Sequence, residues 1–421
     1  MKENLELNLS LIQEAYRRIS KHVLRTPLVE SPLMAADLGW EAPIYLKLES
    51  LQHTGSFKAR GAANKILSLI ERGEKPRRIY ASSAGNHAQA VAFMAKKFNI
   101  EAVIVMPEGA PLVKVNSTEK HGAQVILHGA IYDDAYQKAK ELNDADPDGV
   151  FIHPYDDFEI VAGQGTAALE AIEDLEKMNP DILNDIQVVL PVGGGGLSGG
   201  VSTVFKNLYP ASSCYGVVSD ATPAMALSLK DGAIKKSSAR SRSLADGLAI
   251  KSVCEGNFQL LKKNLEECAL VSDSEVARAI TYNLHSMKLL TEGAGAAGVA
   301  AVLHNKLSLN KKKALMIVLC GGNIDLQKLS HITERSLRAL SRRVLLEVTI
   351  EDKPGQLSKV TRILGEKRAN VLEVSHDRLS DSFEPGETLL VLDVETRGDD
   401  HYHEILKALE EASFVVRKRG S

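Results

Sequence analysis

A lysine at the beginning of a helical pattern is the residue best suited to covalent chemistry. In the stretch GSFKARGA, Gly55 and Ser56 stand where a helix would begin, with Ser56 as a candidate N-cap, and Lys58 falls in the first turn. The positive end of a helix dipole disfavours an ammonium there. Lys58 would therefore more often be a neutral amine, the form that makes a Schiff base. Taken alone, the stretch also fits an ordinary solvated lysine.

A glycine run after an apolar strand pattern offers room for a phosphate. Gly193 to Gly196 follow QVVLPV and open a helix, so their backbone N–H groups can close around an anion. Gly194, Gly196 and Gly199 also satisfy GxGxxG, and Asp220 ends the next strand, as the ribose ligand of a dinucleotide site would. A phosphate loop, a dinucleotide site and a packed glycine run without a ligand all remain open from this motif.

Two further strand ends carry polar groups. SSAGNHAQ offers a hydroxyl, backbone N–H groups and an amide to a carboxylate, from Ser83, Gly85, Asn86 and His87. Such residues are also common local caps. Cys320 ends the apolar pattern ALMIVLC, where a side chain faces the crevice of a parallel sheet, although buried cysteines are usually small hydrophobes. Together, a lysine, a phosphate cradle and a carboxylate turn favour pyridoxal phosphate acting on an amino acid over a nicotinamide dinucleotide.

Alternating strand and helix patterns position these groups. After a helix over about 8–24, strands such as 44–49 and 187–192 alternate with helices near 87–98, 113–121, 131–142, 165–177 and 273–287. This alternation predicts βα units on a parallel sheet that is covered on both faces. After a predicted helix over 324–342, the order becomes βαββαβ in about 80 residues, which indicates a separate ferredoxin-like module.

Composition excludes several classes of protein. The 421 residues are 44% hydrophobic and 25% charged, with a formal net charge of −3. Without a long basic run we expect no nucleic-acid or anionic-membrane partner, and no apolar run approaches the roughly 18 residues of a membrane span. The N-terminus lacks the apolar centre of a signal peptide. The four cysteines are scattered without pairing or metal-ligand spacing, so we expect a cytoplasmic protein with a small-molecule substrate.

The order of the motifs resembles the threonine dehydratase family over about residues 8–325. The matching stretches are TPL, YLKLESLQHTGSFKARGA, SSAGNHAQ, GQGT, GGGGLSGG, LADGLA, TEGAGA and LCGGN. The C-terminal module resembles an ACT regulatory domain, with Asp352 to Gly355 (DKPG) and Asn370 matching its effector pattern. The resemblance implies an α/β enzyme of the tryptophan synthase beta-like fold (fold type II), with two subdomains on open parallel sheets. The implied domains are a catalytic domain over 1–325, with a small subdomain at about 50–155, a linker helix over 326–341 and an ACT-like domain over 342–421.

The resemblance also implies roles for single residues. Lys58 matches the lysine that holds pyridoxal 5′-phosphate, Phe57 the aromatic beside it, and Asn86 the amide facing the cofactor's phenolic oxygen. The remaining cofactor contacts would be the phosphate loop, the acidic motif (EGAGA in place of the usual EPAGA) and the partner of the pyridine nitrogen: Gly193, Gly194, Gly195, Gly196, Leu197, Glu292 and Cys320. The substrate carboxylate would bind the turn of Ser83, Gly85, Asn86 and His87.

The implied reaction is the β-elimination of water from L-threonine, giving 2-oxobutanoate and ammonia. Lys58 would remove the α-proton, and the cofactor phosphate would assist loss of the hydroxyl. A thiol at Cys320 would not keep the ring nitrogen protonated, which should favour elimination over transamination. L-Serine remains open as substrate, because it differs by one methyl group, worth roughly 1 kcal/mol.

Departures from related families narrow the interpretation. Serine racemases have a serine where this chain has Ala84, so we expect little racemisation, and Val218 replaces a glutamate of the family's divalent-ion site, so we expect no metal. The dehydratase pattern accounts for more residues than an NAD-binding oxidoreductase, which would use Asp220. A non-enzymatic amino-acid sensor would require loss of Lys58 or the glycine loop, and both are present.

Regulation is expected from the C-terminal module. The turn before the helix at Gln356 offers N–H groups to an amino-acid carboxylate, with Asp352, Gly355 and Asn370 as candidate effector contacts. The hypothesis is feedback by isoleucine on its own biosynthesis. A dimerisation module without a ligand is the alternative, and the family resemblance implies a homotetramer.

Overall fold

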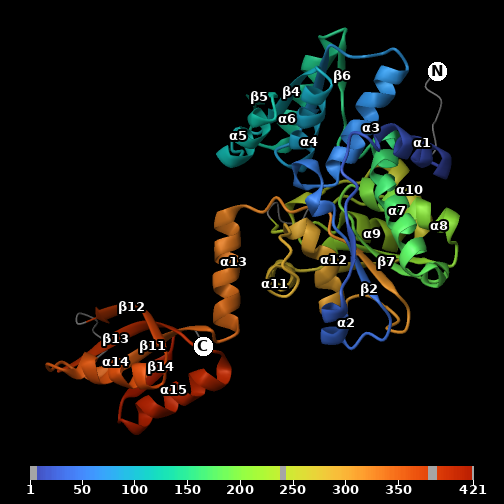
Figure 1. Ribbon diagram of the computed structural model, residues 1–421. Helices are drawn as coiled ribbons and strands as arrows, with labels where there is room; N and C mark the ends of the chain where they lie inside the picture. The colour runs from blue at the N-terminus through green and yellow to red at the C-terminus, as the bar shows by residue number, and fades with distance from the viewer. Residues whose placement is uncertain (1–6, 238–242, 378–385, 420–421) are drawn as a thin grey trace. The chain divides into compact units, whose positions relative to one another are not determined.

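The computed structural model describes residues 7–237, 243–377 and 386–419 (Figure 1). It divides into two compact units, which we call unit 1 (Met1–Ile324) and unit 2 (Asp325–Ser421). Each unit has its own sheets and its own core, so each is described by itself.

The larger sheet of unit 1 has six strands in the order β1-β2-β10-β7-β8-β9. All neighbours are parallel except β1 and β2, which pair antiparallel. The strands are β1 (Leu28–Glu30), β2 (Ile44–Lys47), β7 (Gln187–Pro191), β8 (Ser213–Ser219), β9 (Leu265–Val271) and β10 (Leu315–Val318). Every residue of β2, β7 and β10 is buried, as expected for parallel strands covered on both faces.

The smaller sheet of unit 1 has four parallel strands in the order β5-β4-β3-β6. Its strands are β3 (Arg78–Ser82), β4 (Glu101–Met106), β5 (Gln124–Leu127) and β6 (Gly149–Phe151). Figure 1 shows these strands with α5 and α6 in one part of unit 1, while β2 and β7 lie with α8 and α9 in the other. The predicted parallel βα organisation is confirmed, and it is split between two sheets.

The helices of unit 1 follow the predicted alternation, with additions. They are α1 (Leu9–Ile19), α2 (Pro32–Leu38), α3 (Lys58–Glu71), α4 (Asn86–Lys97), α5 (Leu112–Lys120), α6 (Tyr132–Asp144), α7 (Phe158–Met178), α8 (Gly196–Leu208), α9 (Ala224–Asp231), α10 (Glu255–Asn264), α11 (Asp273–His285) and α12 (Gly293–Leu303). The first helix ends at Ile19 rather than near 24. Helix α7 begins at Phe158 rather than near 165, because the Asp157 side chain accepts a hydrogen bond from Glu159 N (2.8 Å) and caps it.

Unit 2 has the predicted βαββαβ order after helix α13 (Leu326–Ala339). Its elements are β11 (Arg343–Glu351), α14 (Gln356–Glu366), β12 (Asn370–Asp377), β13 (Glu387–Glu395), α15 (Asp399–Glu411) and β14 (Val415–Lys418), and its antiparallel sheet has the order β12-β13-β11-β14. Alternate residues of β11 are buried against Val360 and Leu364 of α14 and Ile405 and Leu409 of α15. A sheet with helices on one face follows from this alternation.

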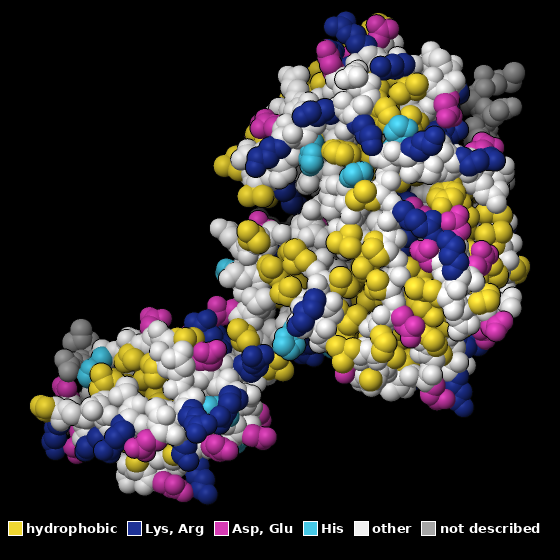
Figure 2. All heavy atoms as spheres, in the orientation of Figure 1, with side chains coloured by type: hydrophobic (Ala, Val, Ile, Leu, Met, Phe, Trp, Pro, Cys, Tyr) yellow, Lys and Arg dark blue, Asp and Glu magenta, His cyan; other side chains and the backbone are white. Residues whose placement is uncertain are grey.

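Charge is mixed over the surface. Figure 2 shows Lys and Arg side chains interspersed with Asp and Glu on the visible face, without one large basic area. Within the ranges that the structure describes, no helix combines the length and apolar character needed to cross a bilayer.

Candidate active site

The turn that carries Lys58 is held by the end of β10. Phe57 N donates to Cys320 O (3.1 Å), Gly322 N donates to Gly55 O (2.9 Å), and Ser56 and Gly321 form an antiparallel bridge. Helix α3 begins at Lys58 with Phe57 in the N-cap position, so the prediction that Ser56 caps the helix is wrong. Backbone pairing with Cys320–Gly322, rather than a side-chain cap, fixes the start of the helix.

The amine of Lys58 is enclosed and its pKa is low. Nζ donates to Pro154 O (2.8 Å) and lies 5.1 Å from the centroid of the Phe57 ring. Burial lowers the pKa of Lys58 to about 8, although the nearby Cys320 and Glu292 act to raise it. About a tenth of the amine is therefore neutral at pH 7, far more than for an ordinary lysine. The predicted direction holds, but the cause is burial rather than the helix dipole.

Cys320 lies beside this amine as a neutral thiol. Its side chain is buried, and burial together with the charge of Glu292 raises the pKa of the thiol well above its usual value. A neutral thiol is a weak donor and acceptor. Cys320 therefore offers a ring nitrogen a weak hydrogen-bond partner and no charge.

A chain of amides connects Asn86 to two other segments. Asn86 Nδ2 donates to Glu292 Oε1 (2.6 Å), and Asn323 Nδ2 donates to Asn86 Oδ1 (2.8 Å). Glu292 stands before the first residue of α12, and its own N–H donates to Gly321 O (3.1 Å). Asn323 belongs to the LCGGN motif, but no feature of the motif had assigned it a role.

The turn at the end of β3 contributes less side-chain chemistry than its sequence suggests. His87 is buried with Nε2 3.1 Å from Ile152 O, and burial with the charge of Lys58 lowers its pKa to about 3. A neutral imidazole beside a carbonyl donates from Nε2. Ser83 Oγ accepts a hydrogen bond from Gly85 N within the turn (3.2 Å). The imidazole of His87 is thus committed to Ile152, which leaves its backbone N–H for any anion at the start of α4.

The glycine loop packs directly on Tyr155 and Asn257. A Cβ atom at Gly194 would lie 2.3 Å from the Tyr155 ring, and Gly195 has a φ of +88°, which side chains disfavour. Asn257 Nδ2 donates to Gly194 O (2.7 Å) and to Tyr155 O (2.9 Å). The loop opens α8 at Gly196, so its geometry is that of an anion cradle at a helix N-terminus.

The segment from Ile152 to Tyr155 organises the site, and sequence reasoning missed it. Its carbonyl groups accept the hydrogen bonds from His87, Lys58 and Asn257 described above. It follows β6, a strand of three residues that is too short to give a periodic pattern. The available signal was the dipeptide Pro154-Tyr155 after a short apolar run.

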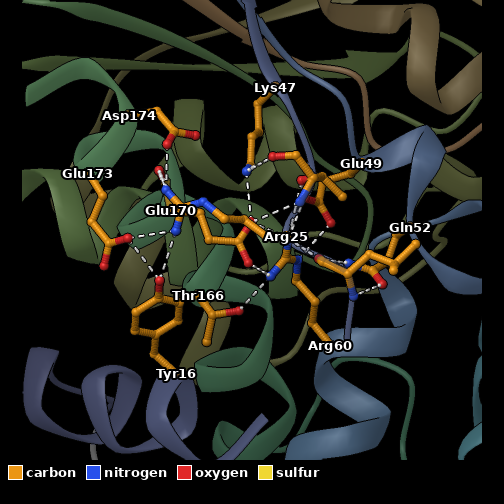
Figure 3. A network of polar contacts seen from close by, with 12 residues as sticks. Tyr16, Arg25, Lys47, Glu49, Gln52, Arg60, Thr166, Glu170, Glu173 and Asp174 are labelled. Carbon is orange, nitrogen blue, oxygen red and sulfur yellow. Dashed lines mark hydrogen bonds and ion pairs between the residues drawn. The ribbon is translucent and has the colours of Figure 1, made fainter. Parts of the chain in front are cut away.

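A buried charge network supports the lysine helix from behind (Figure 3). Arg60, two residues after Lys58, donates to both carboxylate oxygens of Glu49 (2.7 and 2.8 Å) and of Glu170 (both 2.7 Å). Lys47 Nζ donates to Glu170 Oε2 (2.8 Å), and Figure 3 shows Lys47 and Arg60 reaching Glu170 from opposite sides. All four side chains are at most 3% exposed. Two cations and two carboxylates thereby join β2, α3 and α7.

The predicted effector residues do not gather at one place in unit 2. Asp352 follows the end of β11, where Glu351 pairs with Glu387, and Gly355 (φ +90°) precedes α14. Asn370 begins β12 and pairs with Glu395 of β13, and Glu395 in turn pairs with Arg343, the first residue of β11. Asn370 therefore lies level with the start of β11, whereas Asp352 follows its end. The nine residues of β11 separate the two ends of the sheet by roughly 25–30 Å. No single copy of unit 2 lets one amino acid touch both Asp352 and Asn370.

The chain is similar to known proteins over most of its length. The profile of pyridoxal-phosphate dependent enzymes matches residues 19–321, and that of the ACT domain matches residues 344–414. The L-threonine ammonia-lyase of Thermotoga maritima is 43% identical over 414 residues, which cover 98% of this chain and all of that protein. The crystal structure of a threonine deaminase from T.th. has 36% identity and a TM-score of 0.70, covering 76% of this chain and 99% of its own. That of maize serine racemase has 29% identity and a TM-score of 0.71, covering 80% and 99%.

The residues present fit pyridoxal phosphate. The backbone of Gly194 and Gly195, where a Cβ atom would meet Tyr155 or Asn257, would suit a phosphate at the start of α8. Among the described residues, the buried hydroxyl oxygens of Ser56 and Ser82 have no hydrogen-bond partner, which is unusual for buried polar atoms. The low-pKa amine of Lys58 would supply the nucleophile for the aldehyde of the cofactor.

Proposed function

Because the chain belongs to the family of pyridoxal-phosphate dependent enzymes, and matches an L-threonine ammonia-lyase along its whole length, we propose that it deaminates L-threonine to 2-oxobutanoate and ammonia. The observation that carries the proposal is the Lys58 amine beside the neutral Cys320 thiol. The amine donates to Pro154 O, and the next residue, Tyr155, packs on the glycine loop. The catalytic body alone resembles both a deaminase and a racemase. The full-length relative, which spans the C-terminal unit too, decides for the lyase.

The glycine loop, Phe57 and Cys320 would each contact a different part of the cofactor. Bound pyridoxal phosphate supplies an electron-withdrawing ring that makes the α-proton of an amino acid acidic. Gly193, Gly194, Gly195, Gly196 and Leu197 would hold its phosphate, with Phe57 beside the ring. Cys320 would face the ring nitrogen, and its thiol has too high a pKa to act as a charged partner. Without a negatively charged partner, the ring nitrogen would not be kept protonated, and the ring would accept less of the negative charge left when the α-proton is removed. This would favour prompt loss of the β-hydroxyl.

Lys58 would move the α-proton. Its enclosed amine has a pKa of about 8, so Nζ can accept a proton near neutral pH and give it up again. Pro154 O, 2.8 Å from Nζ, accepts a hydrogen bond from the protonated amine and holds it in place. The turn at Ser83, Gly85, Asn86 and His87 would orient the substrate carboxylate, with backbone N–H groups at the start of α4 as the main donors.

The direct test is release of 2-oxo acid from L-threonine and L-serine by the wild-type chain and by Lys58→Ala. We expect turnover of threonine that disappears in Lys58→Ala and persists in the control Lys75→Ala, an exposed lysine outside the site. A preference for serine would change the substrate to L-serine and the product to pyruvate. Absence of 2-oxo acid from both substrates would refute the elimination.

Feedback by isoleucine is part of the same proposal. The ACT match supports an amino-acid effector, and the distance between Asp352 and Asn370 means that an effector touching both must bridge two copies of unit 2. We expect Asp352→Ala and Asn370→Ala each to abolish inhibition by isoleucine while turnover without it is kept. The exposed control Glu411→Ala should stay inhibited. Inhibition that survives in only one variant would remove that residue from the effector site.

The assembly and location follow as proposals. We propose a homotetramer, which supplies the second copy that the effector geometry requires, and a reducing cytoplasm, in keeping with four unpaired cysteines, all of them within the described residues. Light scattering after size-exclusion chromatography measures the mass of the assembly against 45.6 kDa per chain. A monomer that is still inhibited by isoleucine would refute the bridged effector site.

A further inference from the structure

The last residues of unit 1 return to the lysine turn and place an amide beside Asn86. Chain pairing between 320–322 and 55–57 leaves Asn323 opposite Thr54, and Asn323 Nδ2 donates to Thr54 O (2.6 Å). A Cβ atom at Gly55 would lie 2.4 Å from Asn323 Oδ1, so glycine at this position makes room for the amide. Asn323 is exposed to solvent, but its amide is held against the turn by these contacts.

The hydrogen bonds of Asn323 allow only one orientation of the Asn86 amide. Thr54 O can only accept, so it fixes which end of the Asn323 amide carries the NH2 group. The second hydrogen of Asn323 Nδ2 points to Asn86, which must present its oxygen (2.8 Å). At the other end, Asn86 Nδ2 donates to Glu292 Oε1 (2.6 Å). A flipped Asn86 would place donor against donor at Asn323 and acceptor against acceptor at Glu292.

We propose that Asn323 is a positioning residue that keeps the NH2 group of Asn86 directed toward the cofactor. The inference rests on the proposed function, in which Asn86 faces the phenolic oxygen of pyridoxal phosphate. Asn86 Nδ2 has two hydrogens, and Glu292 uses one, which leaves the second for that oxygen. In the flipped orientation Asn86 would present a carbonyl oxygen to an oxygen that carries negative charge, and the contact would be repulsive.

Two variants, Asn323→Asp and Asn323→Ala, distinguish an effect on the orientation of the Asn86 amide from an effect on packing in the turn. Aspartate has the shape of asparagine but cannot donate, so it removes the hydrogen bond to Asn86 Oδ1 and competes with Glu292 for the NH2 group of Asn86. Alanine only removes the restraint. We expect the dissociation constant of pyridoxal phosphate to rise about tenfold or more in Asn323→Asp and about threefold in Asn323→Ala. The visible absorption band of the bound cofactor should shift in Asn323→Asp, because the donor to its phenolic oxygen is lost.

A double-mutant cycle with Asn86→Ala tests whether Asn323 acts through Asn86. We expect Asn86→Ala/Asn323→Asp to bind the cofactor within about twofold of Asn86→Ala, because the amide to be oriented is gone. A role confined to the Thr54 turn would instead lower thermal stability in both backgrounds and leave the band unchanged. The control Asn310→Asp makes the same charge change at another exposed residue, whose Oδ1 accepts from Lys312 N (3.0 Å), and it should match wild type.

The outcomes are distinct from those of the proposed function, because binding and absorption are measured without substrate. An unshifted band in Asn323→Asp, or effects that multiply in the double variant, would overturn the positioning role even in an active threonine ammonia-lyase. A wild-type chain that binds no pyridoxal phosphate would overturn both proposals. If Asn323→Asp does not fold, the cycle of Asn86→Ala with Asn323→Ala makes the same comparison.

Discussion

Replacing Glu170 by glutamine tests the charge balance behind the lysine helix. Glu170 is 3% exposed and accepts hydrogen bonds from Thr26 N (3.2 Å), Lys47 Nζ (2.8 Å), and Nη1 and Nη2 of Arg60 (both 2.7 Å). Glutamine has the same shape, but its NH2 group must face at least one of these donors. The substitution also leaves two buried cations with one carboxylate, that of Glu49.

The expected loss is large because water cannot replace the missing charge. Removing one partner of a buried ion pair costs about 3–5 kcal/mol. The matched control is Glu173, which lies on the same face of α7 and forms an ion pair with Arg25 (2.6 Å). The side chains of Glu173 and Arg25 are each about 40% exposed, whereas Glu170 is buried. Glu173→Gln should cost at most about 1 kcal/mol, as for an exposed ion pair.

Urea unfolding followed by tryptophan fluorescence measures this difference in unit 1 alone. Trp40 is the single tryptophan of the chain, lies in unit 1 and donates from Nε1 to Lys313 O (2.9 Å). All variants are compared at the same saturation with cofactor, because a ligand bound to the folded state adds stability. If Glu170→Gln falls within about 1 kcal/mol of Glu173→Gln, the four buried groups do not act as a coupled set.

In Glu170→Gln, the free energy of unfolding should fall less steeply at acid pH than in the wild type. Burial acts to raise the pKa of Glu170, but the hydrogen bonds and charge of Arg60 and the charge of Lys47 outweigh it and hold the pKa below its usual value. A carboxyl group with a lowered pKa in the folded state stabilises the fold above its unfolded pKa of about 4.3, and this contribution disappears as the pH falls through the folded value. The difference between wild type and Glu170→Gln should therefore persist from pH 7 to about pH 5 and shrink below about pH 4.

Two further predictions concern the cofactor site. Gly194→Ala should weaken binding of pyridoxal phosphate at least tenfold, because its Cβ atom would meet the Tyr155 ring at 2.3 Å. The control Gly199→Ala should bind the cofactor normally, because its Cβ atom meets Leu260 at an ordinary 3.5 Å, and equal affinities of the two variants by equilibrium dialysis would contradict the phosphate cradle. The rate at which the apoenzyme takes up pyridoxal phosphate should rise with pH to a half-maximum near 8, since only the neutral amine of Lys58 reacts, and a midpoint above 10 in stopped-flow absorbance would show an unperturbed lysine.

Sequence patterns predicted some elements in which one face differs from the other, such as β11, but missed others, such as α10 (Glu255–Asn264). The alternation in β11 identified a strand because burial is one-sided there. The spacing of apolar side chains after Lys58 identified a helix, although residues 59–64 are all buried. Helix α12 escaped prediction because its ten residues from Gly293 to Val302 are all buried, so no polar face marks its period. Strands β1 and β6 have three residues each and carry no measurable alternation.

The sequence by itself determined the chemistry on offer: the lysine, the glycines that admit a phosphate, the thiol and the pyridoxal-phosphate motifs in order. Their surroundings were decided only by the fold. Pro154 O became the partner of Lys58, and Asn323 the partner of Asn86, because the ends of β6 and β10 meet the lysine turn and the start of α4. Every residue has a carbonyl group, so nothing in the sequence marks the one that will matter. Likewise, the pKa of Lys58 falls through burial, a property of the assembled unit that no local pattern encodes.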